Sequence, residues 1–452
     1  MKNFLILILI LTIICLPLYA QESSQRLSLK DCIQIALEKN FQINTYKNLY
    51  EQANLGIKQA YSNILPKINT YFTAGKYKVG EATFLGDAVD PITGEVKQIT
   101  LIREGFSRST HSANLNIQQN IFDGGFWWNN IRQRKVEKMA ADFNFRLTEN
   151  QVIKLVAQYY FDLLKQLKLL EVYSLAVQRS KDQLNRAQQM YEIGSVAQVD
   201  VYRAKVNYGQ DRISFLNQEN VVKQAKQRLN IAMGNDPLTP IEIEPEFKFE
   251  HELPPLDNLI HTAMQNQPEL KSKEMDVRSK ELSVALAKSK FFPTLGISFN
   301  YNRDNELLKK IYTDLNKNWT ISYGVRFSFN LFNGFSDQVN YQMSKVNLKN
   351  AKLELVDLKR NLISKIVDLY NNYKAILEIV EINKTNLEAA REEYRLAKER
   401  YRLGSGTSLE LREAQVNLTQ AEQILVSTEY NAIITYIELQ EAVGTVRKAL
   451  NI

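Results

Sequence analysis

An internal duplication most limits what this chain can fold into. The segment MYEIGSVAQVDVYRAKVNYGQ at 190–210 corresponds to RYRLGSGTSLELREAQVNLTQ at 400–420, at an offset of 210 residues. Pro66 and Pro293 also correspond, at an offset of 227 residues. The two offsets differ by 17 residues, which is the length of one gap between the copies. The simplest explanation is that the chain contains two copies of one structural unit, which differ by a variable surface loop.

The first 20 residues stand outside the duplication and are typical of a secretory signal. Lys2 precedes an apolar run that is too short to span a bilayer comfortably, and Ala20 offers a small residue for cleavage. We therefore expect export from the cytoplasm; a lipoprotein and a retained membrane anchor are the alternatives. The remaining chain then divides into a first repeat at 21–235, a linker at 236–255 and a second repeat at 256–452.

Each copy is predicted to begin with one long helix that ends at a proline, Pro66 or Pro293, because proline cannot continue a helix. Apolar and polar residues then alternate, most clearly at 321–331, which is the pattern of a strand with one apolar and one polar face. Two strands per copy are expected. Polar loops join them, a long one near 75–112 and a shorter one near 303–318.

Glycines follow the second strand of each copy and allow a sharp turn, at Gly124, Gly125 and Gly334. Proline-free patterns with apolar residues three and four apart then run over about 126–193 and 336–403. At about 1.5 Å per residue, each of these helices would be about 100 Å long. The spacing indicates coiled-coil packing against neighbouring helices.

Each long helix is predicted to stop at a glycine, Gly194 or Gly404, and to return at once in a helix of about 40 residues. The chain would therefore form two tight helical hairpins. The capping pairs expected after the two glycines are Ser195 with Gln198 and Thr407 with Glu410.

Four strands cannot close a barrel, and an open sheet edge cannot face lipid. If the strands lie in a membrane, several chains must pool them, and two chains give eight strands while three give twelve. Trp127 and Trp128 either mark a bilayer interface or pack at the junction of strand and helix. The predicted fold is mainly α with a membrane β part, built from a duplicated helix–strand–strand–helix–helix unit.

This succession of elements resembles the TolC-type outer-membrane efflux proteins. The segments YEIGSVAQVDV, YRLGSGTSLEL, NIFDGGF and NLFNGF carry the resemblance, which covers about 27–448. It implies a homotrimer whose twelve-stranded β-barrel crosses the outer membrane and continues as an α-helical barrel through the periplasm. Such channels contact outer-membrane lipid, dock onto a periplasmic adaptor protein and an inner-membrane RND or ABC transporter, and serve efflux or type I secretion as passive exit ducts.

The resemblance also assigns roles to residues at the hairpin tips. Glu410 and Glu413 would form stacked carboxylate rings that narrow the periplasmic gate and favour cations, since residues three apart share a helix face. Asp200 matches Glu410 in the first copy and is the third expected gate residue, whereas Arg203 replaces the match of Glu413. Alternatively, Glu410 only caps its helix and Glu413 is merely solvated. The tip residues implied in adaptor contact are Tyr191, Gly194, Ser195, Tyr401, Gly404 and Ser405.

Composition argues against several other classes of protein. The net charge is +7, but Lys and Arg alternate with acidic residues along helices, so nucleic-acid binding is not expected. His111, His251 and His261 have no motif partner, so we expect no catalysis, cofactor or metal. An exported coiled-coil structural protein of the envelope is the alternative function. An adaptor would carry a single hairpin between β-rich domains.

Overall fold

The computed structural model describes residues 26–245 and 253–452, so the predicted signal at 1–20 lies outside the described residues, as does part of the predicted linker. The chain divides into two compact units, each assembled from both copies. Leu49–Asp142 and Ser272–Val356 form the strand-bearing unit. The remaining described residues form the helical unit.

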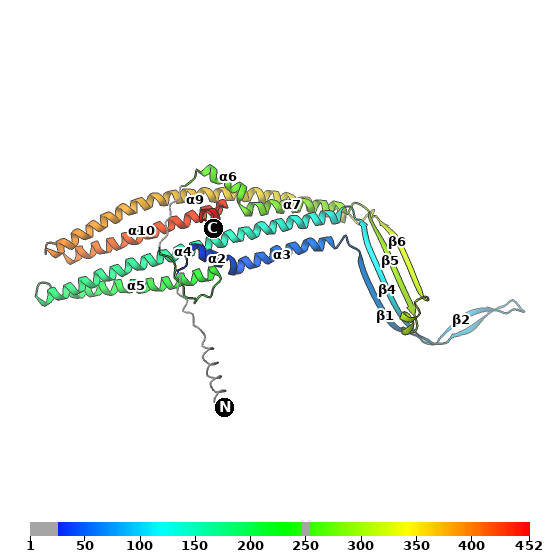
Figure 1. Ribbon diagram of the computed structural model, residues 1–452. Helices are drawn as coiled ribbons and strands as arrows, with labels where there is room; N and C mark the ends of the chain where they lie inside the picture. The colour runs from blue at the N-terminus through cyan, green and yellow to red at the C-terminus, as the bar shows by residue number, and fades with distance from the viewer. Residues whose placement is uncertain (1–25, 246–252) are drawn as a thin grey trace, which may run out of the picture. The chain divides into compact units, whose positions relative to one another are not determined.

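Both copies build two short helices, two strands of one sheet, a long helix and a returning helix, and most of these elements are labelled in Figure 1. The equivalent long helices are equal in length, with 67 residues each in α4 and α9 and 36 residues each in α5 and α10. The first copy contains α2 (Leu29–Lys39), α3 (Phe41–Tyr61), β1 (Lys67–Val79), β2 (Ala82–Val89), β3 (Val96–Arg103), β4 (Phe106–Phe122), α4 (Phe126–Glu192) and α5 (Gln198–Met233). The second copy contains α6 (Leu256–Asn266), α7 (Pro268–Ser289), β5 (Thr294–Asn305), α8 (Leu308–Thr313), β6 (Trp319–Ser328), α9 (Ser336–Arg402), α10 (Ser408–Val443) and α11 (Val446–Ala449). The copies differ in the additional strands β2 and β3 of the first and the additional helices α8 and α11 of the second.

The prediction of one unbroken helix before each proline is wrong. In the first copy the helix is interrupted at Asn40, and in the second at Gln267, both in extended backbone conformation. The buried side-chain amides explain the breaks, since each binds the end of its copy's returning helix. Asn40 Nδ2 donates to the carbonyl oxygen of Ala232 at 2.8 Å, and Gln267 Nε2 donates to that of Ala442 at 3.0 Å.

The returning helices end at Gly234 and Gly444, which make these contacts possible. Both glycines adopt left-handed φ angles, 80° and 82°. A Cβ atom on Gly234 would lie 2.8 Å from the carbonyl oxygen of Lys39, and one on Gly444 would lie 3.2 Å from that of Asn266. We call each set of amide, glycine and helix end an amide joint; the two joints occupy equivalent places in the two copies.

Strands β1, β4, β5 and β6 form one antiparallel sheet in the order β1-β4-β5-β6. The predicted division into an apolar and a polar face is confirmed by the register. One row across the sheet contains Ile68, Ile117, Phe299 and Tyr323. The adjacent row, on the opposite face, contains Asn69, Asn116, Asn300 and Ser322.

The expectation of a polar loop near 75–112 is wrong, because β1 and β4 extend far into this segment and β2 and β3 form a separate antiparallel hairpin between them. The described residues thus hold six strands, of which four share the larger sheet. Apolar and β-branched residues such as Phe84 and Ile99 favour this hairpin. In the second copy the short helix α8 occupies the loop, and β6 ends at Ser328, before the predicted 331.

Turns at the strand–helix junctions fall where the sequence predicts them. Pro66 directly precedes β1 and Pro293 precedes β5. Gly124, Gly125 and Gly334 have φ angles of 68°, 84° and 67°, which L side chains rarely adopt. Space is also restricted at Gly124, where a Cβ atom would lie 2.5 Å from the carbonyl oxygen of Ser289. Beyond this turn the rings of Trp127 and Trp128 stack with centroids 4.3 Å apart.

Candidate functional site

The two hairpin tips have the same backbone geometry. Gly194 and Gly404 adopt φ angles of 73° and 75°, and the backbone closes each helix with the pair of hydrogen bonds of a Schellman motif. In the first tip the amide of Ser195 donates to the carbonyl oxygen of Met190 at 2.8 Å. In the second, the amide of Ser405 donates to that of Arg400 at 2.9 Å. The predicted glycine stops are therefore confirmed.

The caps that follow the glycines differ between the tips. Thr407 and Glu410 form the predicted capping box, in which Thr407 Oγ1 accepts from the Glu410 amide at 3.2 Å. The prediction that Ser195 caps the first returning helix is wrong, because Ala197 is the N-cap and provides no side-chain hydrogen bond. Ala197 is the residue that corresponds to Thr407 at the offset of 210, and alanine has no side-chain acceptor.

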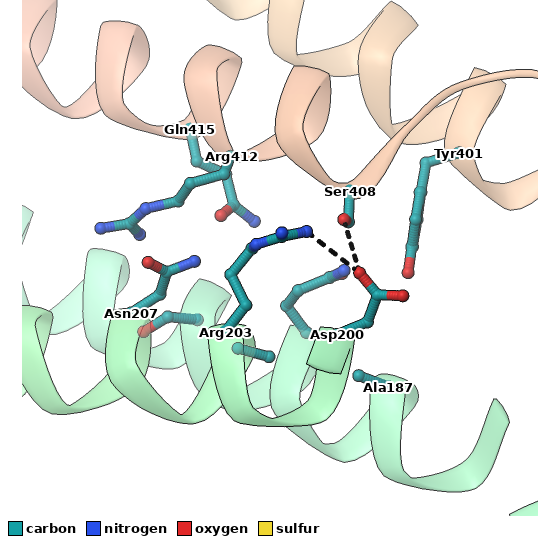
Figure 2. A pocket seen from close by; sticks show the side chains of 11 residues that line it. Ala187, Asp200, Arg203, Asn207, Tyr401, Ser408, Arg412 and Gln415 are labelled. Atoms are coloured by element: carbon teal, nitrogen blue, oxygen red, sulfur yellow. Dashed lines mark hydrogen bonds and ion pairs between the residues drawn. The ribbon is translucent and has the colours of Figure 1, made fainter. Parts of the chain in front are cut away.

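Asp200 joins the first hairpin to the second. It lies in the first turn of α5, and its Oδ1 accepts hydrogen bonds from Arg203 Nη1 at 3.1 Å and from Ser408 Oγ at 3.3 Å. Figure 2 shows both contacts in the small cleft between the hairpins, which Tyr401 and Arg412 also line. The carboxylate thus bonds to the first residue of α10.

The two predicted gate glutamates are exposed on α10. Glu410 Oε2 lies 3.7 Å from Arg400 Nη2 and 3.4 Å from the amide of Thr407, so its carboxylate completes the cap. In the described part of the chain, Glu413 has neither a hydrogen bond nor an ion pair. The structure therefore places these carboxylates one turn apart on one exposed face, and gives Asp200 other partners.

Two ion pairs link the hairpins farther from the tips, and we call them the hairpin clasps. Arg412 binds Asp211 through a bidentate ion pair, with N–O distances of 2.8 and 2.9 Å. Arg179 Nη2 donates to Glu422 Oε2 at 3.0 Å. The side chains of both clasps are mostly buried, with exposed fractions of 21% and 15% for the first pair and 16% and 14% for the second.

The clasps are not predicted from the sequence pattern, although the sequence contains a signal for them. Arg412 corresponds to Tyr202 in the first copy, and Asp211 corresponds to Ala421 in the second. A charge that only one of two equivalent helices carries is a candidate for a contact specific to that copy. Charges are so frequent on these helices that their pairing could not be read from spacing alone.

Tip residues also expose apolar side chains at equivalent positions. Ile193 and Leu403 precede the two glycines and are 79% and 70% exposed. Val199 and Leu409, the second residues of the returning helices, are also exposed. Such apolar groups at the end of a helical hairpin are suited to contact with another protein.

The described residues include no group of three or more His, Cys, Asp or Glu side chains that could hold a metal ion. Among the same residues, no helix is long and apolar enough to cross a membrane.

Comparison with known families identifies the relationship. The sequence model of the family described as outer membrane efflux protein matches residues 32–235 and 259–445, which together make up most of the chain. The chain belongs to the outer membrane efflux protein family. Both matched segments contain a complete helical hairpin with its glycine tip.

Individual members of this efflux family are distantly similar in sequence. The outer membrane protein TolC of Escherichia coli (strain K12) is 21% identical over 359 residues, which cover 76% of this chain and 71% of TolC. The alkaline protease secretion protein AprF of Pseudomonas aeruginosa is 19% identical over 439 residues, covering 96% of this chain and 87% of AprF.

The fold is also that of a solved outer membrane channel. The CmeC outer membrane channel of Campylobacter jejuni superimposes with a TM-score of 0.79 at 18% sequence identity, over 92% of this chain and 86% of CmeC. The predicted mainly α fold with a four-stranded sheet in each chain is thereby confirmed.

Proposed function

We propose that this outer-membrane efflux protein is a passive exit duct formed by three copies of the chain. The observation that carries the proposal is the two-faced sheet. Its edge strands, β1 and β6, each pair on one side only within the described residues. A sheet with an apolar face toward lipid needs both edges paired, and four strands from each of three chains make a closed set of twelve.

The hairpin tips form the periplasmic mouth in this proposal. Glu410 and Glu413 of three chains would line it as carboxylate rings, which favour cations. The clasps hold the second hairpin against the first, so widening the mouth by moving α9 and α10 outward requires these ion pairs to break. Support comes from the burial of the clasps and from the exposed position of the glutamates.

We further propose that the tips bind a periplasmic adaptor, through which the duct joins an inner-membrane transporter of the RND or ABC type. The exposed pairs Ile193 with Leu403 and Val199 with Leu409 present similar apolar groups at both tips. An adaptor could therefore bind either hairpin in a related manner. The names of the relatives include both efflux pump components and a protease secretion protein, so both kinds of assembly remain open.

The test is to express the full chain, extract the outer membrane with detergent and measure assembly mass and conductance in a planar bilayer. The proposal predicts a three-chain assembly that inserts and conducts. A stable single chain that stays in the aqueous fraction and does not conduct would contradict it and favour the coiled-coil structural protein.

A further inference from the structure

The polar face of the sheet carries an uneven distribution of charge. The register places Lys67 in one row with Gln118, Ser298 and Gly324. The next row on the same face, nearer the strand ends that adjoin the helices, contains Gly296 and Arg326. Lys67 is the first residue of β1, and Arg326 lies two residues before the end of β6. Both basic side chains therefore lie at the helix end of the polar face.

Neither basic side chain has an acidic partner at this end in the described part of the chain. Both side chains are exposed, and within 26–245 and 253–452 neither forms an ion pair. Two carboxylates follow the strands at this end, and each has a different partner. Asp123, after β4, accepts a hydrogen bond from the backbone amide of Trp127 at 2.9 Å, and Asp337, in the first turn of α9, accepts from Asn333 Nδ2 at 2.7 Å. The strand residues in the two rows are otherwise uncharged, so the two cations are unbalanced.

Charges at the opposite end of this face are mixed and slightly acidic. Arg108 Nε lies 2.8 Å from Glu306 Oε1, and Asp304 adds a further carboxylate. Between the two ends the face is lined by neutral amides and hydroxyls, including the hydrogen-bonded pairs Asn114 with Asn300 at 2.6 Å and Ser112 with Asn302 at 3.1 Å. The helix end is therefore the positively charged part of an otherwise polar, nearly neutral surface.

We propose that Lys67 and Arg326 form a basic ring in the lumen that favours the passage of anionic solutes. This inference rests on the proposed three-chain duct, in which the ring contains six positive charges. Charges of one sign around a narrow polar passage concentrate counter-ions and repel ions of like charge. The ring thus selects for anions at the strand–helix junction, whereas the glutamates at the tips favour cations.

The test compares wild-type protein with the K67Q/R326Q double variant in planar bilayers under a KCl gradient. The zero-current potential gives the ratio of chloride to potassium permeability. Neutralising the ring should lower this ratio by roughly threefold at low salt, with a smaller effect at 1 M KCl, where charges are screened. The matched control is K309Q/K317Q, which removes two exposed lysine charges from the β5–β6 loop and should leave the ratio unchanged.

Each result has a distinct meaning. A K67Q/R326Q channel that conducts with the wild-type ratio overturns the basic ring and leaves the duct intact. Failure of the wild-type protein to form a conducting assembly overturns the proposed function instead. If the double variant does not assemble, K67Q and R326Q are measured singly. Each should then lower the ratio by part of the full effect, and two unchanged ratios overturn the proposal.

Discussion

Breaking the clasp between Arg412 and Asp211 tests the proposal that the clasps keep the mouth closed. The substitution Arg412→Gln removes the positive charge and the bidentate ion pair while retaining a long polar side chain. The clasp joins α10 of the second hairpin to α5 of the first, so it is a contact between the hairpins. Its loss should weaken the closed arrangement while leaving the glycine tips and the core of the helical unit unchanged.

The size of the effect follows from burial. A charge-assisted pair contributes about 1.5–3 kcal/mol when shielded from water, and exposed pairs contribute about 0–1 kcal/mol. With exposed fractions of 21% and 15%, this clasp lies between these limits, and we take about 1.4 kcal/mol per chain. A change of about 1.4 kcal/mol alters an equilibrium constant about tenfold. If each chain opens independently, its ratio of open to closed conformations should therefore rise about tenfold.

The assay is the open probability of single channels in planar bilayers, with Arg402→Gln as the matched control. Arg402 pairs with Glu399 of its own helix at 2.9 Å, so this substitution removes an arginine charge without touching the contact between hairpins. We expect Arg412→Gln and Asp211→Asn each to raise the open probability, and the double variant to add little. Three variants that all gate like the control would refute the reasoning.

Three further predictions concern the helical unit. Gln267→Ala should lower the free energy of unfolding by about 1–3 kcal/mol, because it leaves the carbonyl of Ala442 without a donor in a buried site. The exposed Gln265→Ala should be close to neutral, and thermal unfolding measures both. Gly234→Ala should reduce the yield of assembled protein, because φ is 80° and the added Cβ atom would clash with the backbone at the end of α2. Gly209→Ala should not reduce the yield, because Gly209 lies within a helix with open space around it. Burial raises the pKa of the Cys32 thiol to about 12, so the thiol stays protonated at pH 8 and maleimide should label it only after unfolding.

Much of this fold was predictable from the sequence because its signals are local. Gly194 and Gly404 each end a helix within a few residues of chain, and the box of Thr407 and Glu410 spans four residues. The duplication then allowed each prediction to be checked against its equivalent. The duplication also indicates that the cap is not Ser195, since Ala197 is the residue that aligns with the N-cap Thr407.

The features that were missed depend on contacts distant in sequence. Asn40 breaks its helix by binding a carbonyl 192 residues away, and nothing in the surrounding helical pattern reveals this partner. Arg412 and Asp211 are 201 residues apart. The β2–β3 hairpin is hard to predict for a different reason. Polar and apolar residues are mixed along it as in a loop, although β-branched residues are frequent in it.

The central claim is that three chains pool their sheets, because β1 and β6 each pair on one side only among the residues that the structure describes. The most direct measurement is the native mass of the detergent-extracted protein, with protection of backbone amides from hydrogen exchange followed along β1 and β6. The account predicts a mass of three chains and slow exchange in both edge strands. A single-chain mass with both edge strands exchanging rapidly would contradict it.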